Sequence, residues 1–270
     1  MAEIITTIAE SLIRSAVILA LAGALCIILQ SLSPSVTTQR IVRNDTKIDF
    51  FYWLMETTML GLVIKLVLAV LITFIAAIGL SGLAGVEAFK NLHVAVQVLI
   101  IIILIDFAGY WLHRFFHGGK RWQFHSIHHS PKELDWISAV RFHPFEPVLV
   151  ITTQYLLAAM LFGFDNKLIG VAMIIRSTYG FFVHSNLSWN LGVFRYVLCS
   201  PVFHRWHHTM IKEGIDKNFG GLFSCWDFIF GTVYLPENGK IQPHSFGVKD
   251  DVGNSFVKQL LYPFKGKPKN

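Results

Sequence analysis

The sequence predicts an all-α integral membrane protein with about four to five transmembrane helices and a cytoplasmic helical cap that holds a histidine-rich dimetal site. Three observations lead to this prediction. Hydrophobic residues make up 53% of the chain and charged residues only 15%, whereas about a quarter of a soluble domain is charged. Several apolar segments are long enough for membrane helices, and histidines gather at the ends of these segments. We treat residues 1–270 as a single membrane-embedded domain.

Five apolar segments account for the predicted helices, and they lie at residues 15–32, 58–78, 94–112, 148–164 and 168–183. A transmembrane helix needs about 20 mostly apolar residues. The first segment has acidic residues before it and no clear cleavage site after it, so we expect it to be retained rather than removed as a signal peptide. The last two segments are three residues apart and predict a tight helical hairpin, either spanning or re-entrant.

The distribution of Arg and Lys predicts the orientation in the membrane. If all five segments cross, the loops at residues 33–57 and 113–147 and the tail from residue 184 lie on one side, and they hold almost all of the basic residues. The opposite loops hold Lys90 and Lys167. The positive-inside rule therefore places the loops and the tail, with every histidine cluster, in the cytoplasm.

Composition also limits the possible partners and sites. The net charge is +6 and the pI is near 9.2, but in an apolar chain such an excess is typical of loops beside anionic lipid, so we expect no nucleic-acid partner. The three cysteines form no C-x-x-C pair, which argues against a disulfide framework and a structural zinc site.

Three histidine clusters are the main chemical signal, and they read His113-Arg-Phe-Phe-His117, His125-Ser-Ile-His128-His129 and His204-Arg-Trp-His207-His208. On a helix, residues three and four positions apart share one face, so H-x-x-x-H offers two imidazoles to a single point and H-x-x-H-H offers three. The clusters supply eight ligands, while one tetrahedral metal needs four. Eight ligands therefore imply two metals, or one metal with many idle histidines.

Several alternatives have to be weighed against a dimetal oxidase. Single histidines such as His93 and His244 are typical surface or core residues. A zinc peptidase is disfavoured because neither H-E-x-x-H nor H-x-x-E-H is present, and haem would use only two histidines. A histidine-rich metal transporter or sensor, or a membrane metallohydrolase, remains an alternative. A transporter would place its ligands inside the spans, near the bilayer midplane.

The pattern closely resembles the fatty acid hydroxylase superfamily, which includes sterol desaturases, sterol methyl oxidases and sphingolipid hydroxylases. The resemblance covers about residues 106–235. Besides the three histidine clusters, its landmarks are Arg141-Phe142-His143-Pro144 with Glu146, His184-Ser185-Asn186-Leu187, Asn218-Phe219-Gly220, and Trp226-Asp227 before Phe230-Gly231-Thr232.

The resemblance implies a non-haem di-iron site. The implied metal ligands are His113, His117, His125, His128, His129, His184, His204, His207 and His208. His143 is a weaker candidate, equally a ligand or a support. Asp106, Glu146 and Asp227 are candidates to accept the remaining N–H of ligand imidazoles. Asp227 could instead cap a helix or pair with a lysine.

The resemblance further implies hydroxylation or desaturation of a C–H bond in a sterol, fatty acyl or sphingolipid-like membrane lipid. The cofactors would be two iron ions, which zinc can replace in purified protein, and O2 would be the co-substrate. The sequence has no flavin, dinucleotide or iron–sulfur fingerprint, so we expect a separate cytochrome b5-like or ferredoxin-like donor with its reductase. Localisation in a bacterial inner membrane is favoured over the endoplasmic reticulum. Arg176, inside an apolar segment, is a functional or buried-pair candidate.

Overall fold

The structure is a computed structural model that describes residues 2–79 and 89–265, and over these residues it is all-helical with three isolated β-bridges. The α-helices are α1 (Ala2–Leu32), α2 (Thr46–Met55), α3 (Gly61–Ala77), α4 (Val94–Phe116), α5 (Trp122–His125), α6 (Phe145–Leu156), α7 (Asn166–His184), α8 (Pro201–His207), α9 (Cys225–Ile229) and α10 (Phe256–Leu261). Two π-helical turns, η1 (Glu56–Leu60) and η6 (Leu157–Leu161), continue α2 into α3 and extend α6. Short 3₁₀ turns are η4 (Gly119–Arg121), η5 (Trp136–Val140), η7 (Gly192–Tyr196), η8 (Lys212–Gly214), η9 (Pro236–Gly239) and η10 (Tyr262–Phe264).

Three helices are long and apolar enough to cross a membrane, and they run over Ile8–Leu32, Thr46–Ala77 and Val94–Phe116. The all-helical membrane architecture predicted from the sequence is therefore confirmed. The segments predicted as a hairpin form α6 with η6, followed closely by α7. Whether these shorter helices also cross stays a prediction, as does the cytoplasmic position of the cap.

The second long helix begins twelve residues before the predicted apolar segment, so part of the expected 33–57 loop is helical. The reason is tertiary packing. Ile48, Tyr52 and Trp53 of α2 are buried in a core shared with α1 and η5, which also contains Cys26 and Ile137. A buried apolar face stabilises a helix well beyond its intrinsic propensity.

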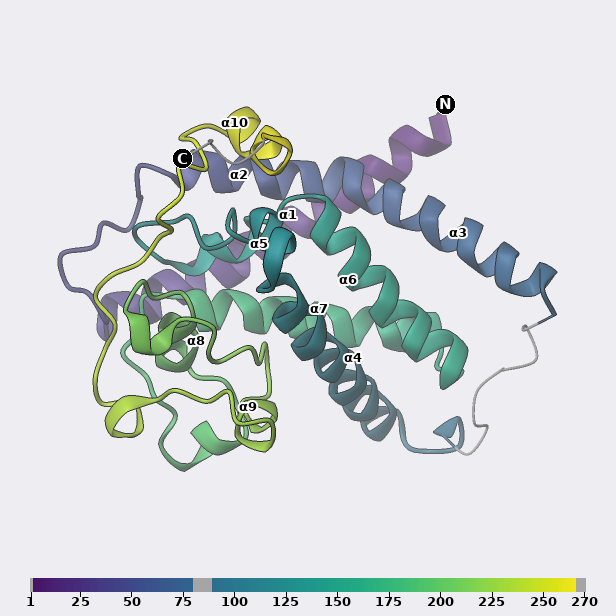
Figure 1. Ribbon diagram of the computed structural model, residues 1–270. Coiled ribbons are helices and arrows are strands. Elements are labelled where there is room, and N and C mark those ends of the chain that lie inside the picture. The colour runs from purple at the N-terminus through teal and green to yellow at the C-terminus, as the bar shows by residue number, and fades with distance from the viewer. Residues whose placement is uncertain (1, 80–88, 266–270) are drawn as a thin grey trace.

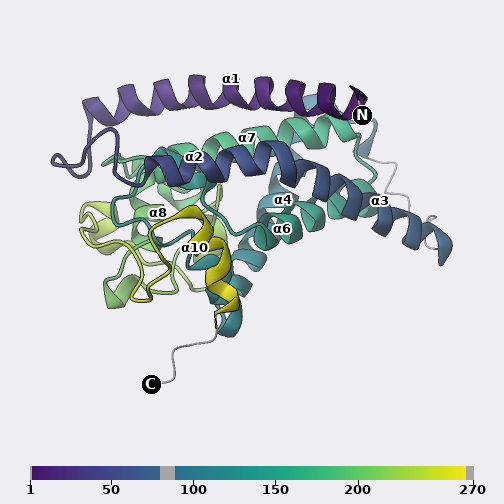
Figure 2. The same cartoon turned by 90° about the horizontal axis from the view of Figure 1, so that it is seen from above.

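The helices form a bundle with the short elements at one end (Figure 1). The α2–η1–α3 helix runs back along α1, and α7 lies beside them (Figure 2). Helix α4 packs against α6 and α7, and α7 also contacts α8 and η5. A second core of Ile101, Ile105, Ala158, Ile169 and Leu222 joins α4, η6 and α7 to the loop after η8. Helices α4 and α7 thus lead from the bundle into the region of α5, α8 and α9, which we call the cap.

A buried charge network attaches α2 to the cap. The Arg43 guanidinium lies 2.7 Å from Asp49 and 2.6 Å from Asp135, and Arg141 Nε lies 2.5 Å from the other oxygen of Asp49. Arg43, Asp49 and Arg141 are each no more than 4% exposed. Buried ions are tolerated only when they are paired and hydrogen-bonded. Asp49 therefore holds two arginines whose segments are far apart in sequence.

We predict that Asp49→Asn lowers the free energy of unfolding by about 3–5 kcal/mol, because it leaves two buried guanidinium groups without their shared anion. Arg14→Gln is the matched control, since its pair with Glu10 is exposed and exposed pairs contribute only about 0–1 kcal/mol. Unfolding of the purified proteins in the same detergent, followed by circular dichroism, measures both. Equal stability of the two variants would contradict the structural role of the network.

Candidate metal centre

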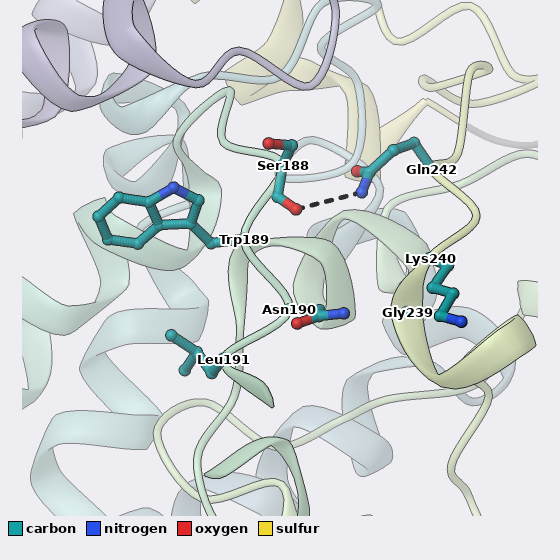
Figure 3. Close-up of a pocket in the computed structure, with 7 residues that line it drawn as sticks. All are labelled: Ser188, Trp189, Asn190, Leu191, Gly239, Lys240 and Gln242. Carbon is teal, nitrogen blue, oxygen red and sulfur yellow. Dashed lines mark hydrogen bonds between the residues drawn. The ribbon is translucent and has the colours of Figure 1, made fainter. Parts of the chain in front are cut away.

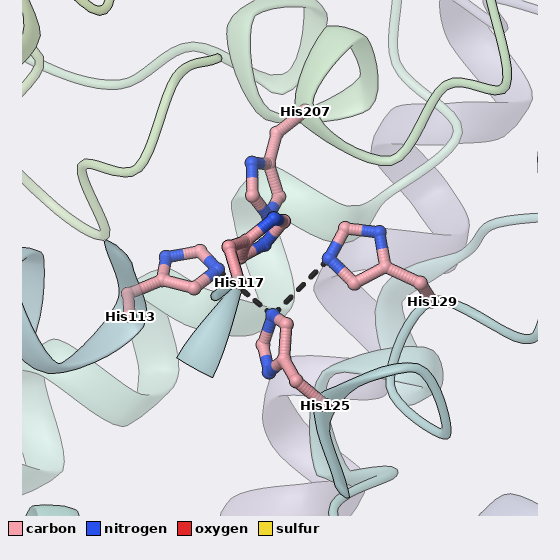
Figure 4. A group of neighbouring side chains, drawn as sticks. All are labelled: His113, His117, His125, His129 and His207. Atoms are coloured by element: carbon pink, nitrogen blue, oxygen red, sulfur yellow. Dashed lines mark hydrogen bonds between the residues drawn. The ribbon is translucent and has the colours of Figure 1, made fainter. Parts of the chain in front are cut away.

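Nine histidines converge in the cap and form two groups. The first, which we call the five-histidine group, contains His113, His117, His125, His129 and His207. The second, the four-histidine group, contains His128, His184, His204 and His208. Within each group one ring nitrogen per residue lies within 4.8 Å of the others. Figure 4 shows the five-histidine group, whose rings come from three separate segments and point toward one another. The two groups comprise the nine histidines expected from the sequence.

The helical spacing explains how the chain fills both groups. His113 and His117, four residues apart at the end of α4, share the five-histidine group, as expected for one helix face. The two H-x-x-H-H motifs behave differently from our expectation, because neither brings three imidazoles to one point. In each motif the residues four apart share one group, and the middle histidine, either His128 or His207, belongs to the other.

Six of the nine rings are held by an acceptor at Nδ1. Main-chain carbonyl oxygens of Phe219, Arg141, Gly180 and Lys217 face the Nδ1 atoms of His113, His128, His184 and His207 at 2.7–3.2 Å. Carboxylates serve the other two: Asp216 lies 2.9 Å from His117, and Glu146 lies 2.9 Å from His125. Such partners fix the tautomer and the orientation of a ring that uses its other nitrogen as a metal ligand.

The pair His128 and His184 carries the strongest indication of a cation. Their Nδ1 atoms face carbonyl oxygens, which can only accept, so each ring keeps its proton on Nδ1. Their Nε2 atoms nevertheless lie 3.1 Å apart. Two lone pairs at this distance repel each other unless a positive ion lies between them. The nitrogens of this pair therefore fit a bound metal better than a hydrogen bond.

Burial keeps the imidazoles uncharged. Desolvation, together with the neighbouring imidazoles, lowers the pKa well below the usual value for six histidines outside the long helices: His125, His128, His129, His204, His207 and His208. A neutral imidazole is the form that binds a metal. In addition, Phe142 stacks on the His128 ring with a centroid distance of 4.0 Å. The cap thus presents unprotonated nitrogen ligands in a dry setting.

Of the three carboxylates expected to hold imidazoles, only Glu146 contacts one. Asp106 instead accepts hydrogen bonds from the main-chain N–H groups of Leu222 and Phe223 and from Trp226 Nε1. The expectation was wrong for Asp227 as well, whose oxygens accept from the N–H groups of Phe219 and Gly220 and from the Thr232 hydroxyl. Both aspartates fix the 218–223 loop, and the Phe219 carbonyl of this loop in turn faces His113.

His143 lies outside both groups. Its Nδ1 accepts from the N–H of Phe145 at the start of α6, and its Nε2 faces the carbonyl oxygen of Leu260. The ring packs on Phe124. This position favours a supporting role over ligation. The sequence did not predict Asp216, which contacts His117 but belongs to no recognisable motif. It did not predict the carbonyl acceptors either, because main-chain groups leave no signal in the sequence.

A cavity of about 640 Å³ leads to the histidines between α1, α3, α6 and α7. His113, His125, His128, His184 and His204 line its inner end. The remaining wall is mainly apolar and includes Ile18, Leu19, Val140, Phe142, Val150, Ile151, Met173, Ile174, Phe181 and Val183. This size is typical of a site for a small organic molecule or lipid segment.

A second hollow, of about 650 Å³, lies on the cap and is open to the surface. Its lining residues are Ser188, Trp189, Asn190, Leu191, Gly239, Lys240 and Gln242 (Figure 3). None of them is a histidine or an acid. The hollow therefore offers no metal ligands, and we assign the candidate site to the cavity that reaches the histidines.

We predict that the metal-free protein loses stability as the pH falls from 8 to 5. The buried histidines have lowered pKa values, so below the ordinary value of about 6.5 the unfolded chain binds protons that the folded chain does not. Each such histidine costs up to about 1.4 kcal/mol per pH unit. Thermal unfolding of chelator-treated protein in detergent measures the slope. His208→Gln should reduce it, whereas the exposed His244→Gln should not; a pH-independent Tm would contradict the prediction.

Comparison with known proteins agrees with the geometry. The chain is 31% identical to the ornithine lipid hydroxylase of Rhizobium tropici over 180 residues, which is 64% of this chain and 52% of that protein. It is 34% identical to human alkylglycerol monooxygenase over 51% of this chain and 30% of that one. Methylsterol monooxygenase 1-2 of Arabidopsis thaliana is 25% identical over 69% of this chain and 56% of its own length. The matches thus span about half or less of these first relatives, and no solved structure matches.

The family model described as fatty acid hydroxylase matches residues 98–232, which is half of the chain. This range holds all nine clustered histidines, Asp106, Asp227 and Glu146. The chain belongs to the fatty acid hydroxylase family.

Proposed function

We propose that the chain is a membrane-bound, O2-dependent non-haem di-iron oxidoreductase that hydroxylates or desaturates a C–H bond of a lipid. The observation that carries the proposal is the pair of Nε2 lone pairs on His128 and His184, which face each other at 3.1 Å at the inner end of an apolar cavity. Family membership and the names of the relatives support a lipid as substrate. A sterol, fatty acyl or sphingolipid-like chain suits the cavity wall.

The nine histidines would hold two ions, one in each group. Five neighbouring pairs of Nε2 atoms within the groups lie 3.0–3.1 Å apart. That distance is shorter than the roughly 3.4 Å edge of a tetrahedral site with bonds of about 2.1 Å. It suits a metal with more than four ligands, and iron is among the metals that imidazole ligands suit. Zinc can occupy the same imidazoles in purified protein.

When bound, the iron ions would supply the activation of O2 that attack on an unactivated C–H bond requires. The protein's own contribution is position. Acceptors at Nδ1 hold the imidazoles, and Glu146 orients His125. Phe142, which stacks on His128, and Val140 line the cavity, so they would contact a bound lipid chain and exclude water from it. The apolar part of the wall would bind the hydrocarbon chain of the lipid.

The electron donor is proposed to be a separate cytochrome b5-like or ferredoxin-like protein with its reductase. The proposed location is a bacterial inner membrane with the metal site on the cytoplasmic side. Support for this orientation comes from the positions of the basic residues around the cap. Lys120 and Lys212 are exposed there, and acidic carriers associate faster with a basic face.

We expect two metals per chain and lipid-dependent O2 consumption in the iron-loaded enzyme. His129→Ala in the five-histidine group and His208→Ala in the four-histidine group should each remove the metal of that group and abolish turnover. His143→Ala is the matched control and should keep both metals, with activity reduced by no more than about 10–100-fold. Metal analysis and an oxygen electrode provide both measurements.

Several outcomes would refute this reading. One metal in fully active protein would refute the di-iron proposal, and retention of both metals in His129→Ala and His208→Ala would refute the ligand assignment. Metal movement across vesicles without O2 consumption would indicate a transporter, and O2-independent product formation would indicate a hydrolase. Lipid mass spectrometry of cells with and without the protein identifies the product.

The orientation leads to a separate prediction. In a Cys225→Ser background, Lys120→Cys and Lys212→Cys should resist a membrane-impermeant thiol reagent in intact cells and react after the cells are opened, because both positions lie on the cap. Lys90→Cys, beyond the opposite end of the bundle, should react in intact cells. Labelling of position 120 or 212 from outside would reverse the proposed topology.

A further inference from the structure

The wall of the cavity contains charged side chains that the oxidation chemistry does not use. Apart from Glu146, the charged residues that line it are Glu10, Arg14 and Lys65, together with Glu56 and Arg176, which each lie within a long, mainly apolar helix. A charge inside a membrane helix is costly and is usually retained for a function. What these two side chains contact therefore decides whether they are structural or available to a ligand.

Glu56 has no hydrogen-bond or ion-pair partner among the described residues. It begins the π-helical turn η1, and such turns are often found at functional sites. The neighbouring polar groups bond to one another instead: Trp53 Nε1 donates to Ser15 Oγ at 2.8 Å, and Ser15 Oγ lies 3.1 Å from Thr57 Oγ1. The carboxylate is left free to face the cavity.

Arg176 is only partly engaged. Its Nε donates to Asp106 at 3.2 Å, and its side chain is 26% exposed. Asp106 already accepts three other hydrogen bonds from the 222–226 segment. The terminal nitrogens of Arg176 have no partner among the described residues. An arginine fork in this state can still bind an acceptor group.

Two glycines leave room for the guanidinium. A Cβ on Gly109 would lie 2.6 Å from Arg176 Nη2, and a Cβ on Gly221 would lie 2.8 Å from the same atom. Gly109 is one helical turn before His113, and Arg176 is eight residues before His184, which is about 12 Å along α7. The free end of Arg176 thus lies close to the histidines.

We propose that Glu56 and Arg176 bind the polar head of the lipid, Arg176 through an anionic oxygen such as a carboxylate or phosphate, and Glu56 through an ammonium or hydroxyl group. The substrate class is a lipid whose head carries both a negative acceptor and a donor. This inference deepens the proposed function and rests on it. It also places the oxidised carbon near the head, rather than at the far end of a long chain.

The test is the binding of three probes with the same saturated chain: palmitate, hexadecylamine and N-palmitoyl-lysine. Titrations of the purified full-length protein in detergent, without O2, are followed by native mass spectrometry. Arg176→Gln should weaken palmitate and N-palmitoyl-lysine about tenfold or more and leave hexadecylamine unchanged, because a charge-assisted hydrogen bond is lost. Glu56→Gln should weaken hexadecylamine and N-palmitoyl-lysine and leave palmitate unchanged.

For each variant, the probe that should bind normally serves as the folding control: hexadecylamine for Arg176→Gln and palmitate for Glu56→Gln. Gly109→Ala gives a second route, since it displaces the guanidinium without removing it and should weaken palmitate and N-palmitoyl-lysine but not hexadecylamine. Glu213→Gln and Lys249→Gln, both exposed on the surface, should change nothing. Equal weakening of all three probes by either variant, or no weakening at all, overturns the proposal. Lipid-dependent O2 consumption is not part of this assay, so failure of the proposed oxidation is recognised separately.

Discussion

The repulsion between imidazole lone pairs is the constraint on which the cap depends. His128 and His184 are both held from behind by carbonyl oxygens, so their Nε2 atoms meet without a proton between them. Such an arrangement needs a cation to be stable, and the protein has to supply enough rigidity to keep the ligands together. Burial contributes by lowering the pKa of most of the clustered histidines, which keeps them ready to bind.

Part of this rigidity comes from carboxylates that do not contact an imidazole. Asp106 and Asp227 satisfy main-chain N–H groups of the 218–223 loop, and this loop supplies the carbonyl that faces His113. On the other side of the cap, Asp49 holds Arg141, whose own carbonyl faces His128. Hydrogen bonds of this kind position a metal ligand through one intermediate group, which is the usual role of outer partners.

Much of this arrangement could be predicted from sequence, and the exceptions have physical reasons. The length of the apolar segments predicts the long helices. The start of α2 depends on packing against α1 and η5, which the pattern of apolar residues in the sequence does not show. Histidine spacing identifies eight of the nine clustered residues, and the family resemblance adds His184. The spacing cannot divide them into groups, because even His204 and His207, which lie in the single helix α8, belong to different groups. The carbonyl acceptors cannot be predicted from the sequence because every residue has a carbonyl group. That the Glu56 side chain has no partner is seen only once its polar neighbours are found to bond to one another.

The division of the H-x-x-H-H motifs has a mechanical consequence. His128 and His129 are consecutive residues, yet they belong to different groups. The same is true of His207 and His208. Consecutive Cα atoms are fixed about 3.8 Å apart by the trans peptide. At two places, a single peptide unit therefore connects a ligand of one group to a ligand of the other. A shift of the backbone under one group therefore also shifts ligands of the other group, so the two centres are coupled through the chain itself as well as through the packing of helices.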